Sequence, residues 1–235
     1  MPRRRLVLRA ASVSAVCLLT LGGCGADEPE EDEPSPAEVL ATAKTTLDET
    51  SGVRIDLATE DLPDGISGLA AAEGVGTHAP AFEGTITVVL SGTSLEVPVV
   101  AVDGTVYAQL PLTVGWTEDI DPADYGAPDP AGLMSTESGF SSLLPATEGL
   151  ERGESVRGGE DNDEILTEFT GTVPGEAVSA IIPSASGEFA AAYTVSEADE
   201  LREMTLTGVF YPDSAEMSYT VAFSDYGTEQ DIVAP

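Results

Sequence analysis

The sequence has few of the residues on which most metalloenzymes and nucleic-acid-binding proteins depend. Its 235 residues include one His, one Trp, one Asn and two Cys, and 9 Lys and Arg stand against 42 Asp and Glu. Four of the basic residues lie in the first nine positions and no acid precedes Asp27, so the remainder carries 5 − 42 = −37. This balance excludes a basic face for nucleic acid and a polybasic patch for anionic lipid. The scarcity of His and Cys argues against metal centres and thiol nucleophiles, so we expect no metal, no cofactor and no catalytic residue.

The N-terminus has the pattern of an export signal. Residues 2–5 are a positively charged stretch with three arginines, and residues 6–21 form a mostly apolar run that is too short to span a bilayer comfortably. The run ends in Leu21-Gly22-Gly23-Cys24, which resembles the lipobox of bacterial lipoproteins. We therefore predict a signal peptide over residues 1–23, cleavage before Cys24, and diacylglycerol on its thiol. An ordinary signal peptide with an incidental Cys is the alternative.

The segment after Cys24 predicts a tether between a membrane anchor and a folded domain. Residues 25–34 contain six acids and two prolines and no large apolar residue, which favours an extended, solvated chain. Cleavage would remove Cys17 and lipidation would use Cys24, so the mature protein would have no disulfide. We expect the protein on the outer face of the cell membrane, with residues 24–34 as tether and 35–235 as a single domain.

The body reads as an α+β domain with an antiparallel sheet. Ser35-Pro36-Ala37-Glu38 is a capping box that opens a helix over about 36–50, and period-2 alternation marks about nine strands. The Gly- and Ala-rich residues 61–81 are expected to form a loop or lid, and Pro98 marks an edge strand or a bulge. The strands are expected at about 53–57, 82–90, 95–102, 106–110, 150–157, 164–173, 188–195, 201–211 and 215–225, with short helices within 132–144 and after Pro174.

Several strands are apolar on one face, yet the helices are short. Such a sheet leaves either a plainly packed core or a cavity lined by aliphatic side chains, and alternation alone does not decide between them.

A set of ordered landmarks resembles one known family. Val102-Asp103-Gly104-Thr105-Val106-Tyr107-Ala108 is similar to the hydrophobic-Asp-Gly-x-hydrophobic-Tyr-Ala run of the LppX/LprA/LprF/LprG family of mycobacterial lipoproteins. Further landmarks follow in the family's order over about 35–235: Trp116-Thr117-Glu118, Thr170-Gly171-Thr172-Val173 and Phe223-Ser224-Asp225-Tyr226-Gly227. The resemblance implies a strongly bent antiparallel sheet, a half-barrel, with helices on its concave side and an apolar cavity between them.

The same resemblance implies a carrier without an enzymatic step. Family members bind multi-acyl lipids or glycolipids and help to move them to the outer envelope, in some cases beside a membrane exporter. The high negative charge of this chain puts recognition of anionic headgroups in doubt. The candidate cavity-lining residues are Ile86, Val88, Leu90, Leu95, Val97, Val99, Val106, Ala108 and Leu110 from the sheet, and Leu40, Leu47, Leu143, Leu144, Val178 and Ile181 from the helices.

Two other readings stay open. The first is an exported hydrolase, but the sequence contains no G-x-S-x-G elbow. The serines of residues 138–142 have only His78 as a possible base, and a lone His is more often an exposed loop residue. Acid clusters such as Glu160-Asp161 and Asp163-Glu164 fit a solvated loop better than a glycosidase or calcium site. A structural or docking lipoprotein without a ligand is the remaining alternative.

Overall fold

The computed structural model describes residues 33–235, except Asp61, Asp64, Leu112, Asp119, Gly126, Glu160 and Asp161. The predicted signal peptide, Cys24 and most of the predicted tether therefore lie outside the described residues. Residues Pro34–Pro235 form one compact unit. Its elements in chain order are α1 (Pro36–Glu49), β1 (Gly52–Ala58), β2 (Gly68–Thr77), β3 (Ala81–Leu90), β4 (Thr93–Val102), β5 (Thr105–Ala108), the 3₁₀ helices η1 (Pro122–Tyr125), η2 (Pro130–Met134) and η3 (Phe140–Ser142), α2 (Leu143–Ala146), β6 (Glu148–Gly158), β7 (Glu164–Pro174), α3 (Gly175–Val178), β8 (Ser186–Ser196), β9 (Leu201–Val209) and β10 (Met217–Ser224).

The strands form one open antiparallel sheet. Its order is β5-β4-β3-β2-β1-β10-β9-β8-β7-β6, so each half of the chain is a meander of five strands. The first and last strands of the domain, β1 and β10, pair in the middle, with Ile55 opposite Phe223. The strands β5 and β6 are therefore the two edges, and the chain between them must cross from one end of the sheet to the other.

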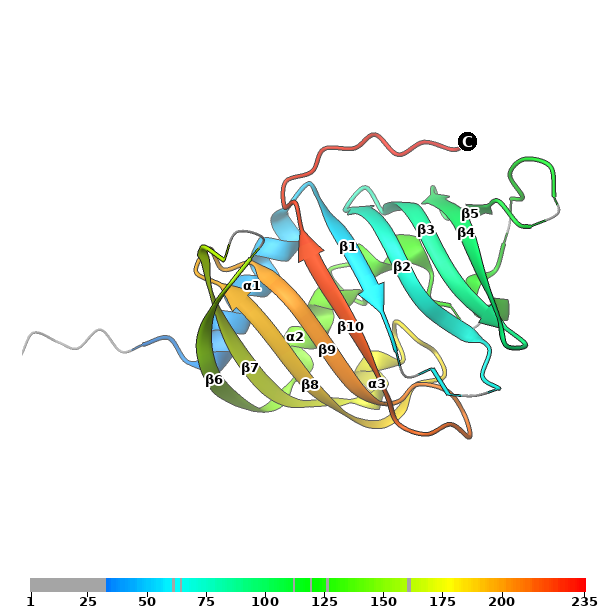
Figure 1. Ribbon diagram of the computed structural model, residues 1–235. Coiled ribbons are helices and arrows are strands. Elements are labelled where there is room, and N and C mark those ends of the chain that lie inside the picture. Colours follow the sequence, from blue (N-terminus) through cyan, green and yellow to red (C-terminus); the bar gives the residue numbers. More distant parts are fainter. Residues whose placement is uncertain are drawn as a thin grey trace, which may run out of the picture. The chain divides into compact units, whose positions relative to one another are not determined.

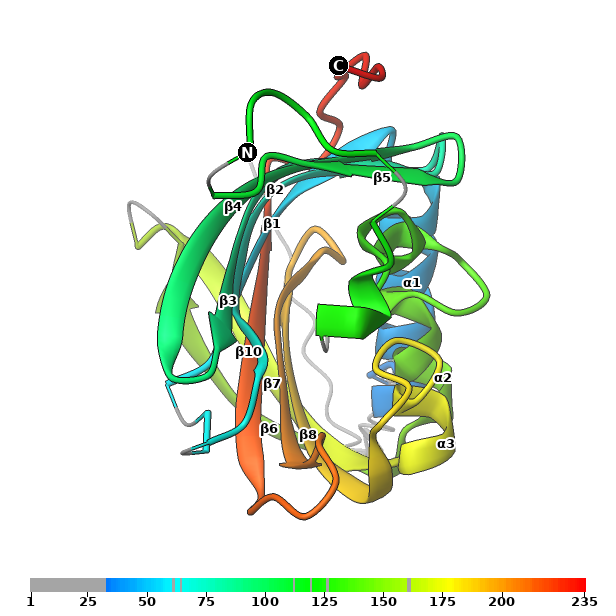
Figure 2. The same cartoon turned by 90° about the vertical axis from the view of Figure 1, so that its right-hand side faces the viewer.

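The sheet bends around the helices. Figure 2 shows α1, α2 and α3 on one side of the sheet, which curves toward them at both ends. In Figure 1 the strands lie in front of the helices, so that view faces the convex side. The crossing from β5 to β6 carries η1, η2, η3 and α2 over the concave side. The predicted fold, a bent antiparallel sheet with helices on its concave side, is confirmed.

Helix α1 begins where the sequence predicts. The Ser35 backbone N–H donates to Glu38 Oε2 at 2.8 Å and the Glu38 N–H donates to Ser35 Oγ at 3.4 Å, which completes the capping box. The Ser35 hydroxyl, which donates to Glu38 Oε2 at 2.6 Å, and the Ser35 backbone N–H together hold the pKa of the Glu38 carboxyl below its usual value. Leu40, Ala43 and Leu47 follow at helical spacing and are buried against the sheet.

The expected loop over 61–81 is wrong for most of its length, because residues 68–77 form β2. This strand pairs with β1 on one side and β3 on the other, so the sheet has ten strands. Its glycines are there because another side chain needs the space. Gly74 pairs with Gly84 of β3, and the ring of buried Phe82 lies across both. Glycine in a strand usually weakens it, but here it admits an aromatic ring over the backbone.

We expect Gly74→Val to destabilise the domain by about 2–4 kcal/mol, because a side chain at this position would collide with the Glu83 carbonyl oxygen and the Phe82 ring. Gly132→Ala is the control, since its Cβ would have no heavy atom closer than 3.8 Å among those it meets. Urea unfolding of both variants measures the effect. Equal midpoints would show that β2 does not require a glycine there.

Strand β4 is neither an edge nor bulged at Pro98, which corrects a second expectation. It lies between β3 and β5 in regular register. The carbonyl of Pro98 accepts a hydrogen bond from Gln109 N–H at 3.0 Å, just beyond the end of β5. The proline nitrogen therefore faces the side on which β5 has ended, where no strand residue requires its missing donor.

The elements expected within 132–144 are also shorter than predicted. Two 3₁₀ helices and the four-residue α2 replace one helix, and β5 ends at Ala108 before reaching Leu110.

Candidate ligand cavity

An aliphatic surface covers the concave face of β3, β4 and β5. Strand register brings it together, because residues that pair directly across strands share a face. Ile86 lies opposite Val97, Val88 opposite Leu95, and Val99 opposite Ala108. This alternation is the pattern that the sequence analysis identified on these strands.

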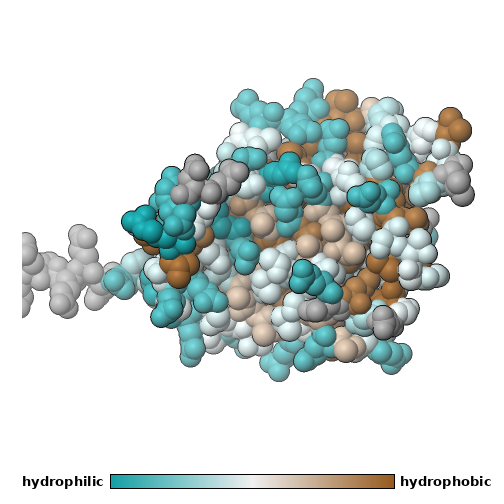
Figure 3. Space-filling view, viewed as in Figure 1, coloured by the Kyte–Doolittle hydropathy of each residue, from teal (hydrophilic) through white to brown (hydrophobic). Residues whose placement is uncertain are grey.

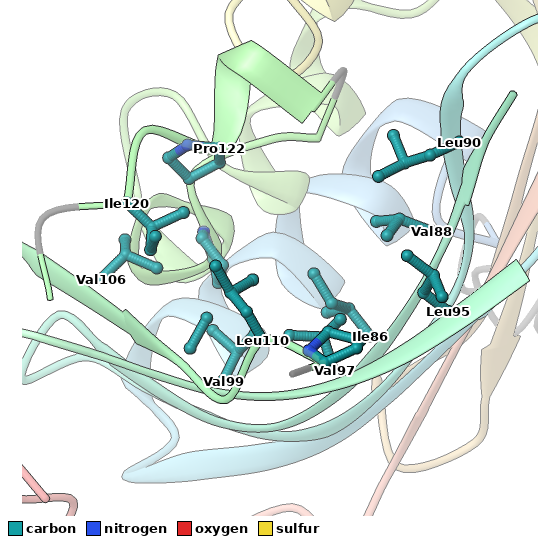
Figure 4. A pocket seen from close by; sticks show the side chains of 13 residues that line it. Ile86, Val88, Leu90, Leu95, Val97, Val99, Val106, Leu110, Ile120 and Pro122 are labelled. Carbon is teal, nitrogen blue, oxygen red and sulfur yellow. The ribbon is translucent and has the colours of Figure 1, made fainter. Parts of the chain in front are cut away.

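This surface is one wall of an apolar cavity. Thirteen residues line it, nine of which are the sheet residues named as candidates from the sequence. Figure 4 shows Leu110 reaching into the space between the sheet and the crossing segment, with Ile120 and Pro122 opposite. All thirteen are aliphatic or proline: Ile86, Val88, Leu90, Leu95, Val97, Val99, Val106, Ala108, Leu110, Pro111, Ile120, Pro122 and Pro130.

The cavity is narrow and partly open. About 60 Å³ of it is open to a water-sized molecule, which is room for roughly four to six waters. Val88, Val97, Val99 and Ala108 are buried in its floor, whereas Ile86, Leu90 and Leu95 remain partly exposed. Aliphatic side chains that face inward and still meet solvent indicate a lined space, because a packed core would cover them.

Side-chain size explains why the space lies at this end of the sheet. The concave face of β7, β8 and β10 carries buried aromatic residues, among them Phe169, Tyr193 and Phe223, which fill the region beneath the helices. On β3 the only aromatic residue is Phe82 at the strand's start, followed on the same face by Gly84, Ile86, Val88 and Leu90. The smaller side chains leave volume that the crossing segment does not fill.

The six candidates from helices do not lie in this cavity. Leu40, Leu47, Leu143 and Leu144 are at most 1% exposed and belong to the main core. Val178 and Ile181 line a second, smaller space near α3, of which about 30 Å³ is open to a water-sized molecule. Their helical spacing predicted burial but did not reveal which part of the sheet each helix covers.

The second space contains one polar side chain, Tyr219. Its hydroxyl donates to the Leu69 carbonyl and lies 2.9 Å from the Tyr211 hydroxyl. Burial raises the pKa of Tyr219, so its hydroxyl stays neutral at physiological pH. Both spaces therefore favour an uncharged, apolar occupant.

Four lining residues were missed by sequence reasoning. Pro111, Ile120, Pro122 and Pro130 belong to the crossing segment, which reads as an acid-rich loop. Isolated apolar residues between acids were the available signal, but they have no periodicity that predicts a shared face.

The serines proposed for a hydrolase occupy a structural cluster. Ser141 Oγ donates to Asp48 Oδ1 at 2.5 Å, and Lys44 Nζ donates to Asp48 Oδ2 at 2.6 Å and to the Thr136 carbonyl at 2.9 Å. His78 is half-buried, which corrects the expectation of an exposed residue, and its Nε2 lies 2.8 Å from the Leu47 carbonyl oxygen. These bonds join α1 to the β2–β3 turn and to η3.

The candidate cavity has no donor for a metal or cofactor. Its thirteen side chains contain no nitrogen, oxygen or sulfur ligand outside the backbone. Across the described part of the chain, no three His, Cys, Asp or Glu residues are grouped to hold a metal ion. In the same part, no helix has the length and apolar character needed to cross a bilayer.

The fold and cavity define a class: an open antiparallel half-barrel that encloses an apolar space beneath its crossing segment. The chain belongs to the LppX_LprAFG lipoprotein family, whose model matches residues 35–232. The crystal structure of LprF from Mycobacterium bovis superposes with a TM-score of 0.69 at 13% identity, covering 86% of this chain and 98% of LprF. Lipoprotein LppX from Mycobacterium tuberculosis gives 0.62 at 16% identity, covering 86% and 100%. No match was found among curated proteins.

Proposed function

We propose that this protein is an envelope lipoprotein, anchored through Cys24, that binds lipid in the β3–β5 cavity and carries it toward the outer envelope. The observation that supports this most is the uniformly aliphatic lining of a space that the chain leaves unfilled. Apolar lining favours acyl chains, since each buried methylene contributes about 0.8 kcal/mol without any charged contact. Membership of a lipoprotein family supports the anchor.

The volume limits how much lipid enters this form of the protein. The roughly 60 Å³ that a water-sized molecule can enter holds about four to six waters, or a similar number of methylenes. That is a short part of one acyl chain. A whole chain, and still more a multi-acyl lipid, would need the second space as well, or a movement of the crossing segment away from the sheet.

The headgroup would stay outside the cavity. No lining side chain is charged, and the domain from residue 34 onward carries 5 − 36 = −31, since six of the 42 acids precede it. That charge disfavours anionic headgroups at the protein surface. We therefore expect a preference for neutral lipids and glycolipids. Transfer to a membrane exporter, which the family resemblance implies, stays a prediction.

Binding of a fluorescent monoacylglycerol tests this proposal. The probe is uncharged and the cavity has no titratable side chain, so we expect saturable binding with the same affinity from pH 5 to pH 9. Intact probe should be recovered by organic extraction after incubation. Absence of saturable binding would favour a docking lipoprotein without a ligand, whereas release of fatty acid would favour a hydrolase.

A further inference from the structure

The segment between β5 and η1, whose Leu110 and Pro111 line the cavity, exposes one hydrophobic side chain to solvent. Val114 is 104% exposed, the highest value among the large hydrophobic residues that stand out on the described surface. Figure 1 shows this segment projecting beyond the edge strand β5 at the upper right. A single exposed valine is ordinary on a protein surface, so its surroundings decide whether it has a role.

The base of this segment is held by backbone hydrogen bonds and by side-chain contacts on both faces of the sheet. Ala108 and Thr117 exchange two backbone hydrogen bonds of 2.9 Å, which close a loop whose described residues are 109–111 and 113–116. Leu110 and Pro111 line the cavity on the concave side. Trp116 packs against a separate cluster that includes Val100, Val102 and Ile232. The loop therefore presents its tip outward from a firmly held base at the edge of the cavity.

The loop is also free of charge in a strongly acidic protein. Residues 104–117 contain no Asp, Glu, Lys or Arg, although 22% of the chain is charged. In Figure 3 hydrophobic surface gathers toward the end of the sheet that carries β3–β5, whereas hydrophilic surface dominates around β6. Acids resume directly after the loop, at Glu118, so only the loop itself is uncharged at this end of the domain. Because the domain carries a net charge of −31 from residue 34 onward, a lipid surface would be approached at lower electrostatic cost through this loop than through the acidic surface around it.

We propose that Val114 of this loop inserts into a neutral lipid bilayer and so brings the cavity wall at Leu110 and Pro111 close to the membrane from which lipid enters. This rests on the proposed function and adds the route of loading. An acyl chain could then pass along Leu110 and Pro111 into the cavity without crossing water. Insertion of one side chain is a weak contact. It suffices for a protein that a lipid anchor already holds near the membrane, because the anchor keeps the effective concentration of the domain there high.

A single-cysteine fluorescence experiment tests the insertion. In the mature chain with Cys24→Ser, Val114→Cys introduces the sole thiol, and Val156→Cys provides a control on β6, where Val156 is 55% exposed. Both are labelled with an environment-sensitive dye and mixed with phosphatidylcholine vesicles. We expect a blue shift and quenching by bilayer-borne quencher at position 114 alone. Equal responses at both positions, or a shift at 114 that needs no vesicles, would overturn the proposal; the latter would indicate self-association.

Transfer kinetics separate this proposal from the proposed function. Val114→Asp should slow transfer of the monoacylglycerol from vesicles roughly tenfold, while binding of probe added from solvent stays unchanged. Val156→Asp should change neither. Wild-type transfer by Val114→Asp would overturn insertion and leave lipid binding intact. Failure of the unmodified protein to bind solvent-delivered probe would instead remove the proposed function, on which the loading route depends.

Discussion

Ile86→Trp should abolish most lipid binding while leaving the domain folded. Ile86 lies in the middle of the β3 wall, opposite Val97, and is partly exposed within the cavity. An indole there would occupy the space that an acyl chain needs. In a packed core, added volume costs about 1–3 kcal/mol and would lower the melting temperature by about 2–12 °C. A cavity wall has room for the ring, so we expect a shift below about 2 °C together with loss of the fluorescent monoacylglycerol signal.

Thr87→Trp is the matched control for this variant. Thr87 is the next residue of β3 and faces the opposite side of the sheet because strand side chains alternate. The same indole is therefore introduced outside the cavity, and binding should remain. A destabilised Ile86→Trp protein, with no lipid bound by either the variant or the wild type, would show that this face is a packed core.

Cys24→Ala should move the protein from the membrane fraction to the medium, or leave it as an uncleaved precursor. Two acyl chains on Cys24 would give durable anchoring, and the alanine variant has no thiol to carry them. The prediction depends on the Leu21-Gly22-Gly23-Cys24 sequence and on the lipoprotein family of the chain. Fractionation followed by detection of the protein measures it.

Cys17→Ala separates lipidation from a general effect of losing a thiol. Cys17 lies in the predicted signal peptide, so its removal should leave both maturation and membrane retention unchanged. Normal processing and retention of Cys24→Ala would contradict the predicted anchor, whatever the behaviour of Cys17→Ala.

Local alternation predicted the sheet wall because a strand's side-chain period fixes which residues share a face. An Asp-Gly pair is also a strong hairpin signal; Asp103 and Gly104 form the turn between the paired strands β4 and β5, and both have the positive φ that this turn requires. From these local features, nine residues of one surface could be named by number. That surface encloses unfilled space, which alternation could not establish.

Packing between segments that are distant in the chain could not be predicted from local sequence patterns. Residues 68–77 have the composition of a loop, and only the ring of Phe82 over Gly74 and Gly84 explains why glycine suits that strand. Helical spacing identified Leu143 and Val178 as buried, yet one joins the main core and the other lines a second space. The sequence also did not predict that Ile120 and Pro130 of the crossing segment line the cavity.

Mass spectrometry of organic extracts tests the central claim most directly. The mature protein would be purified from the cells that produce it, and its extract compared with that of Ile86→Trp purified in parallel. We expect an acylated lipid in near-stoichiometric amount from the wild type, neutral or glycosylated in its headgroup, and little from the variant. Wild-type protein that carries no acylated lipid beyond its own Cys24 anchor, with Ile86→Trp clearly destabilised, would contradict a lipid-carrying cavity.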